Sequence, residues 1–514
     1  MVNMNPARYH SVALTSSDHL GARTRPGRIA LIVVGLVLAA SFYGVGVSIG
    51  GRSGLLIGCL STLILTVISY EAIVRLLPTM FGPRVIVIVF AVQTIALILI
   101  LISGGSTIPA GISIIGVDLA EHIAPLCMSQ IFALVGTVAA VLIVRAVFVG
   151  RIRLQGGEPL FKRIPAGSQW LILVAIILLM FRLIISAALE SRVRYGLLIL
   201  TAPLEFVPFV AGRLSSEYQS VRRACLTILI LTTILGFFMG SRHGINQIAL
   251  YVIGSMTLLR GAKLRRAIIR VGLVAVLLLY IAALVGIIRG ETGRDNITLL
   301  QPTQMAQTLA LAEHYAENGE LGSEQIQQNG VARLLAWPNA AVVVLAPDPI
   351  PYRGLNSILE EISQYAIISG GSTDANGAYL ANGLGTAPAS GFGFLVNTHT
   401  SVEFGLVADG WSKGGPFGVI LICYLFTTSM ILLEVLVSNF RILSAQTKVL
   451  LLCIVMNTAF MVSTSPAVSL IRSLILQLLL WALVLFCIDQ VMPRRHERLR
   501  MRRRNETGIV WESS

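Results

Sequence analysis

The sequence predicts an all-α polytopic membrane protein, with about twelve transmembrane helices and one large external loop domain. Three observations support this prediction. First, 55% of the 514 residues are hydrophobic and only 12% are charged, whereas soluble proteins have about 45–50% and about 25%. Second, the apolar residues form continuous runs instead of the alternating pattern of a transmembrane β-barrel. Third, Lys and Arg concentrate in every second connection between the runs.

The apolar runs give the order of the helices. A helix of roughly 17–25 residues crosses the hydrocarbon core of a bilayer. The first run is too long for the core of a signal peptide and has no clear cleavage site, so we expect it to be retained as a helix. The candidate spans lie near 28–50, 54–76, 85–104, 126–149, 169–189, 195–212, 224–240, 244–260, 271–288, 416–437, 449–465 and 467–492.

The distribution of basic residues predicts that both termini are cytoplasmic. With this orientation Arg75, Arg84 and the basic tail PRRHERLRMRRR lie inside, and the connection 105–125, which has no Lys or Arg, lies outside. Cytoplasmic loops then account for the net charge of +14, and we expect no nucleic-acid partner. The predicted domains are a cytoplasmic segment 1–27, transmembrane helices 28–288, an external loop domain 289–415, transmembrane helices 416–492 and a basic cytoplasmic tail 493–514.

The external loop domain contains two predicted helices. Met305, Leu309 and Ala312 have helical spacing with acidic residues opposite, which predicts an amphipathic helix that ends at Gly319. The stretch PYRGLNSILEEISQYAII predicts a second helix. All six cysteines fall in or at the edges of spans and none has CxxC spacing, so we expect neither a disulfide framework nor a zinc site.

Several cations are predicted on the external side, against the usual bias. The connection MGSRHGIN places Arg242 and His243 there. A guanidinium is always charged and its forked donors match phosphate oxygens, so these residues are candidate ligands of a pyrophosphate. Alternatively, some of them extend to lipid phosphates or pair with neighbouring acidic residues. The other candidate cations are Arg192, Arg194, Arg289, Arg294, Arg333, Arg353 and, near the outer end of the last span, Arg472.

The sixth span is predicted to bend or break. Pro203 and Pro208 lie on either side of Glu205, and each proline removes a backbone donor. A carboxylate in a span needs a cavity or a partner, and Arg182 in the fifth span is a candidate partner. We interpret the two residues as a structural ion pair.

The segment NTHTSVEFGLVADGWSKGGPFGVIL leads into the tenth span and holds candidate catalytic residues. His399 and Glu403 are four residues apart, hence on one face of a helix, as a base and its assisting carboxylate require. Lys413 adds a positive charge beside two glycines, where backbone amides can approach a phosphate. The alternative for His399 is a surface histidine at the membrane interface. The acidic stretch DLAEH, 118–122, fits a solvated helix cap better than a metal site, so no metal is assigned.

The arrangement resembles the O-antigen polymerase and ligase superfamily. The resemblance rests on about twelve spans, one late external loop, the turn Gly240-Ser241-Arg242, and an H…E…G…G pattern formed by His399, Glu403, Gly410 and Gly418. One pattern found in some of these polymerases, an arginine followed by glycine eleven residues later, does not start at any of the external arginines outside the last span.

This resemblance implies a Wzy-type enzyme, a metal-independent glycosyltransferase of the bacterial inner membrane. It would transfer a growing glycan from undecaprenyl pyrophosphate onto the next lipid-linked repeat unit, in surface or exopolysaccharide synthesis. His399 or Glu403 would be the base, and Arg242, Arg289 and Arg294 would stabilise the leaving group. No cofactor is expected, and the sequence has no ATP-binding GxxxxGK[ST] motif. The implied partners are the lipid-pyrophosphate-linked oligosaccharide, membrane lipids, a chain-length regulator and export proteins. The alternatives are an O-antigen ligase, a flippase or other secondary transporter, and a structural subunit of an export complex.

Overall fold

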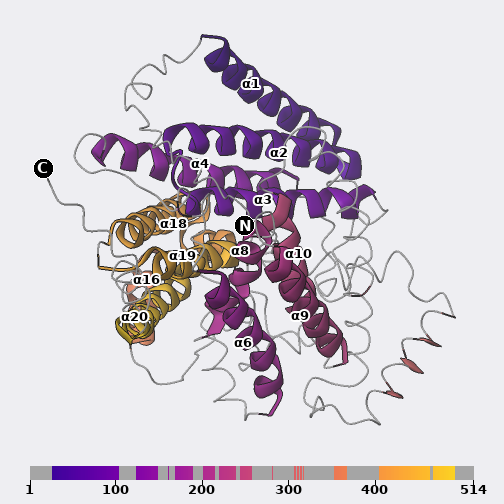
Figure 1. Cartoon of the computed structure of the whole chain (residues 1–514). Coiled ribbons are helices and arrows are strands. Elements are labelled where there is room, and N and C mark those ends of the chain that lie inside the picture. Colours follow the sequence, from indigo (N-terminus) through magenta and orange to yellow (C-terminus); the bar gives the residue numbers. More distant parts are fainter. Residues whose placement is uncertain are drawn as a thin grey trace, which may run out of the picture.

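The computed structural model of the chain is built of helices wherever it is described (Figure 1). The described residues are 26–102, 123–148, 160, 168–188, 201–214, 219–238, 243–256, 281, seven positions between 306 and 317, 352–366, 405–440, 442–463 and 467–491. No strand occurs among them, which confirms the all-α class for this part of the chain.

The helices follow the predicted apolar runs closely. Every predicted run except that near 271–288, which is described only at residue 281, contains a described helix. The elements are α1 (Pro26–Ile49), α2 (Gly51–Leu76), α3 (Gly82–Ile102), α4 (Ile123–Phe148), α6 (Ser168–Ala188), the 3₁₀ helix η4 (Ala202–Phe206), α8 (Val207–Leu214), α9 (Gln219–Phe238), α10 (His243–Met256), α16 (Asn356–Ala366), α18 (Leu406–Asn439), α19 (Ala445–Phe460), the 3₁₀ helix η8 (Met461–Ser463) and α20 (Ala467–Val491).

Four helices in the described part of the chain are long and apolar enough to cross a membrane. They contain Gly51–Leu76, Cys127–Phe148, Leu406–Asn439 and Leu470–Cys487, and shorter apolar helices accompany them. A helix satisfies all its interior backbone groups within one segment, which is what a chain in hydrocarbon requires. Large aliphatic side chains such as Val37 and Leu479 are exposed on these helices, as expected where lipid replaces water. The protein is therefore an α-helical membrane protein.

The helix bundle has three groups around a buried centre. In Figure 1, α1 to α4 form one layer. The group α18 to α20 and the group α6, α9 and α10 both lie on the same side of this layer. α19 is central, because it contacts α3, η4, α18 and α20 and residues 451–459 of it are all buried. A helix that is apolar on all sides is expected at such a position.

Contacts at the helix ends show that neighbouring helices alternate in direction. Arg52, at the start of α2, donates from Nε to the Leu101 carbonyl at the end of α3, at 2.6 Å. Arg145, near the end of α4, donates to the Leu76 carbonyl at the end of α2, also at 2.6 Å. The predicted topology brings the same ends together, because odd spans run outward and even spans return.

Small residues permit the closest helix crossings. A Cβ built on Gly136 in α4 would overlap the carbonyl oxygen of Ile420 in α18, and one built on Gly212 in α8 would overlap that of Tyr251 in α10. Such small-residue contacts let membrane helices associate through backbone packing, since lipid provides little hydrophobic force between helices. α18, which carries the site described below, is thereby held against α4.

Candidate functional site

The start of α18 is kinked where the sequence predicts the boundary between loop and membrane. The backbone leaves helical geometry at Gly414 (φ −174°, ψ 32°) and Gly415 (φ 56°, ψ −140°), and Pro416 begins the second part of the helix. In an unbroken helix the Ser412 carbonyl would accept from residue 416, but proline has no N–H. The backbone N–H of Arg353 donates to that carbonyl instead, at 2.8 Å. The chain before α16 is thus fixed to the kink.

Two of the glycines behind the family resemblance have a structural reason at this kink. A Cβ on Gly410 would lie 2.6 Å from the Cα of Val419, and one on Gly418 would overlap the Gly410 carbonyl. The two parts of α18 therefore touch through their backbones, which only glycine allows at both positions. The GxxxxxxxG spacing is explained by packing across the kink.

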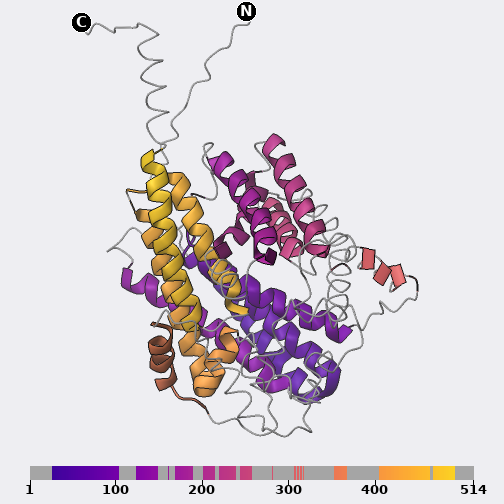
Figure 2. The ribbon, with the colours of Figure 1, turned by 90° about the horizontal axis from the view of Figure 1, so that it is seen from below.

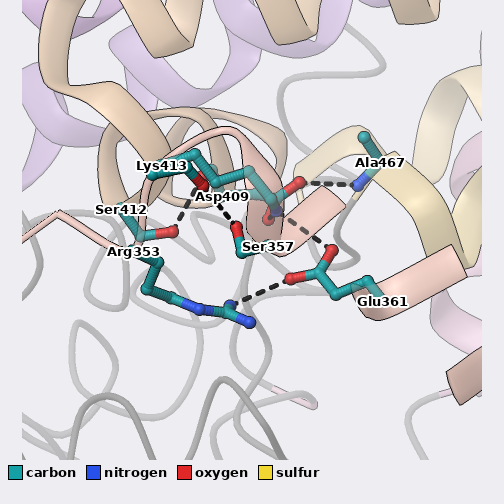
Figure 3. Close-up of polar contacts among 8 residues, drawn as sticks. Arg353, Ser357, Glu361, Asp409, Ser412, Lys413 and Ala467 are labelled. Atoms are coloured by element: carbon teal, nitrogen blue, oxygen red, sulfur yellow. Dashed lines mark hydrogen bonds and ion pairs between the residues drawn. The ribbon is translucent and has the colours of Figure 1, made fainter. Parts of the chain in front are cut away.

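Four charged side chains meet beside the kink (Figure 3). The ammonium of Lys413, which is completely buried, contacts Oδ1 of Asp409 and lies 3.1 Å from Oε2 of Glu361. Nη1 of Arg353 lies 2.9 Å from Oε1 of the same glutamate. Two cations thus face two carboxylates, and their formal charges sum to zero. We call Arg353, Glu361, Asp409 and Lys413 the charge cluster.

The charge cluster joins three helices at one end of the bundle. Oδ2 of Asp409 accepts a hydrogen bond from the backbone N–H of Ala467 at the start of α20, at 3.0 Å. The free N–H groups and dipole of a helix N-terminus favour a negative charge. Glu361 belongs to α16, Asp409 and Lys413 to α18, and Ala467 to α20. Figure 2 shows α16 beside the start of α20.

The environment of Glu361 raises the pKa of its carboxyl group. Burial raises the pKa of this carboxyl above its ordinary value, and the negative charge of Asp409 raises the pKa further. Lys413 and Arg353 act in the opposite direction and stabilise the carboxylate. Desolvation and the charge of Asp409 together outweigh the two cations at this position.

The predicted ion pair between the fifth and sixth spans is confirmed. Nη1 of Arg182 lies 2.6 Å from Oε1 of Glu205, and the arginine side chain is buried while that of the glutamate is 24% exposed. The predicted break is also present, because Ala202–Phe206 forms the 3₁₀ helix η4 before α8 begins. The two prolines account for this change of geometry.

The sequence interpretation missed three buried acidic residues, which are Glu361 and Asp409 of the charge cluster and Glu434. Glu434, near the far end of α18, is buried and accepts hydrogen bonds from the backbone N–H groups of Phe81, at 2.7 Å, and Gly82, at 2.8 Å. It thereby satisfies donors at the start of α3, as a capping side chain does. The sequence signal was present, since an acid within an apolar run needs a partner.

The structure describes four of the predicted ligand residues. Lys413 and Arg353, predicted as pyrophosphate ligands, are paired with carboxylates in the charge cluster. Burial requires this pairing, because an unpaired ammonium in the interior is strongly unfavourable. Arg472 lies in the second turn of α20 and is half-buried, and His243 is the first residue of α10. Outside the described residues lie Arg192, Arg194, Arg242, Arg289, Arg294, Arg333, His399 and Glu403.

The fold and the charge cluster define an α-helical membrane protein whose helices are braced at one end by buried ion pairs. No protein-family model, curated protein or solved structure matches the chain.

Proposed function

We propose that the protein polymerises lipid-linked oligosaccharide repeat units at the external face of the bacterial inner membrane. The observation that best supports this proposal is the charge cluster. It ties α16, the helix in the predicted external loop, to the kinked start of α18 and to α20. Glu403 and His399 come directly before this kinked segment in the sequence. A braced support next to a catalytic segment suits a reaction that depends on the positioning of two large substrates.

The chemistry needs only a base, cations and orientation. A hydroxyl of the next repeat unit attacks the anomeric carbon of the growing glycan, and the new C–O bond replaces the bond to the pyrophosphate. The electron pair of the broken bond leaves with the lipid pyrophosphate, and His399 or Glu403 takes the proton of the attacking hydroxyl. Imidazole can accept this proton near neutral pH.

The external arginines would stabilise the leaving pyrophosphate. In this proposal Arg242, Arg289 and Arg294 hold its charge, because forked guanidinium donors match phosphate oxygens. Lys413 and Arg353 are given a different role from the one the sequence suggested: they position α16 and α18, since both already have carboxylate partners. The other predicted cations, Arg192, Arg194, Arg333, Arg472 and His243, remain candidate contacts of the same headgroup.

The test is reconstitution of the purified protein in liposomes with a lipid-pyrophosphate-linked repeat unit, followed by separation of the products by size. We expect a ladder of lipid-linked multiples that His399→Ala and Arg242→Ala abolish in folded protein. The matched control is Arg75→Ala, since Arg75 lies at the predicted cytoplasmic end and pairs with Glu71 on the surface of α2.

Each other outcome of this experiment would indicate a different activity or a different catalytic residue. Transfer of one intact glycan to an acceptor without a ladder would identify a ligase. Substrate on the opposite leaflet with no new glycosidic bond would identify a flippase. A ladder unchanged by His399→Ala would exclude this histidine as the base and leave Glu403 as the remaining candidate.

A further inference from the structure

The described polar side chains of α16 that are directed at the bundle, Ser357 and Glu361, already have partners. Ser357 and Glu361 are buried, and Ile358 is packed against the core of the bundle. Glu361 makes its ion pairs with Lys413 and Arg353 on this side. Two of the three described side chains on the face directed at α18 and α20 are therefore polar, whereas an ordinary surface helix buries an apolar face.

The opposite face of α16 and the residues just before it carry large exposed apolar side chains. The exposed fractions are 57% for Tyr352, 41% for Leu355, 69% for Leu359 and 50% for Ile362. The last three are spaced by four and three residues, so they form one stripe along the helix. These four residues are called the α16 stripe.

Helix α16, which carries the α16 stripe, packs against a membrane helix with exposed apolar side chains. α16 contacts α20, on which Ile475, Leu476 and Leu479 are exposed. Phe417, which follows the kink of α18, is 64% exposed. These side chains belong to helices long and apolar enough to cross a membrane. The stripe thus lies on the exposed side of a helix that packs at the end of the bundle where α18 and α20 begin.

We propose that α16 is an interfacial membrane helix, and that the α16 stripe inserts into the acyl-chain boundary of the adjoining leaflet. The helix NSILEEISQYA contains no Lys or Arg, so the attraction is apolar and does not depend on anionic headgroups. Tyr352 suits this depth, since an aromatic ring with a polar hydroxyl favours the headgroup level. The polar face is meanwhile held by the charge cluster, so α16 lies along the surface instead of inserting across it.

The test places spin labels on the full-length protein in phosphatidylcholine vesicles. Cys487 is exposed and the other five cysteines are buried, so Cys487→Ser gives a background of low labelling. Leu359→Cys and Leu355→Cys report on the stripe. Asn356→Cys is the matched control, because Asn356 is an exposed polar residue of the same helix outside the stripe. Collision with oxygen, which is enriched in lipid, is compared with collision with a water-soluble nickel chelate.

We expect the oxygen-to-nickel ratio at positions 355 and 359 to exceed that at position 356 several-fold. The ratio should stay the same when anionic lipid is added to the vesicles. A ratio at both stripe positions as low as at position 356 would place the stripe in water and overturn the proposal. Low collision with both reagents would show protein contact and also overturn it. Dipolar broadening that disappears on dilution with unlabelled protein would then identify a second copy as the partner.

Discussion

Removal of the Lys413 charge is the most direct test of the charge cluster. Lys413→Met keeps the length of the side chain but leaves the buried carboxylates of Asp409 and Glu361 with one cation, Arg353. Loss of one partner of a buried ion pair costs about 3–5 kcal/mol, because the remaining charge stays desolvated. We expect a loss of this size in the free energy of unfolding.

The measurement is unfolding in mixed micelles with a rising fraction of sodium dodecyl sulfate, followed by near-ultraviolet circular dichroism. Arg75→Met is the control, because an exposed pair such as Arg75–Glu71 contributes only about 0.3–0.5 kcal/mol. The charge-balanced variant Lys413→Met/Asp409→Asn should lose less unfolding free energy than Lys413→Met and Asp409→Asn lose together. The difference should be at least about 1 kcal/mol, which is within the usual coupling energy of neighbouring residues. A loss below about 1 kcal/mol for Lys413→Met, or additive effects, would refute an electrostatic role for the cluster.

Three further predictions follow from the same geometry. Gly415→Ala should lower the free energy of unfolding by about 1–3 kcal/mol in the same titration, because φ is +56° and the new Cβ would crowd the ring of Tyr352. Gly414→Ala is the control and should be tolerated, because φ is −174° and the new Cβ would point into open space. Arg182→Met should cost about 2 kcal/mol, less than for a fully buried pair because Glu205 is 24% exposed, and Arg182→Met/Glu205→Gln should recover most of the loss; no recovery would contradict the pairing. Because its pKa is raised, Glu361 contributes to the free energy of unfolding fully below about pH 4.3, and this contribution is lost as pH rises through the raised pKa. Glu361→Gln should therefore lose less thermal stability than the wild type between pH 4 and pH 7, and equal slopes would exclude this residue as the cause.

The membrane helices were predictable because hydrocarbon imposes a strict rule on the sequence. A span must be apolar and long, so α2, α4, α18 and α20 coincide with predicted runs. The kink at Gly414 and Gly415 falls at the predicted boundary of the loop for a similarly local reason, since two glycines before Pro416 cannot continue a stable helix.

Only one of the two partners of Lys413 could have been predicted, because the other lies in a distant segment. Asp409 is one helical turn away, and its spacing alone could have suggested a pair. Glu361 is far away in sequence, on a separate helix, and no local pattern links it to Lys413. Arg182 and Glu205 were easier, because two charges in neighbouring apolar spans have few other partners. The sequence interpretation therefore singled out Arg353 and Lys413 but assigned them to a pyrophosphate ligand, and it did not identify Glu361 and Asp409 as their partners.

The neutrality of the charge cluster separates stability from substrate binding. Lys413 is completely buried and already paired with Asp409 and Glu361, so a pyrophosphate that bound it would have to compete with a buried carboxylate, at a cost of several kcal/mol. If the proposed function is correct, cations outside the cluster must therefore hold the substrate, and Arg242 is the leading candidate. Lys413→Met should then lower the amount of folded protein more than it lowers activity per folded molecule, because Lys413 positions helices without binding substrate, while Arg242→Ala should lower mainly activity per folded molecule. Measurement of polymer yield together with folded protein distinguishes the two roles, and equal losses of specific activity in both variants would contradict this separation.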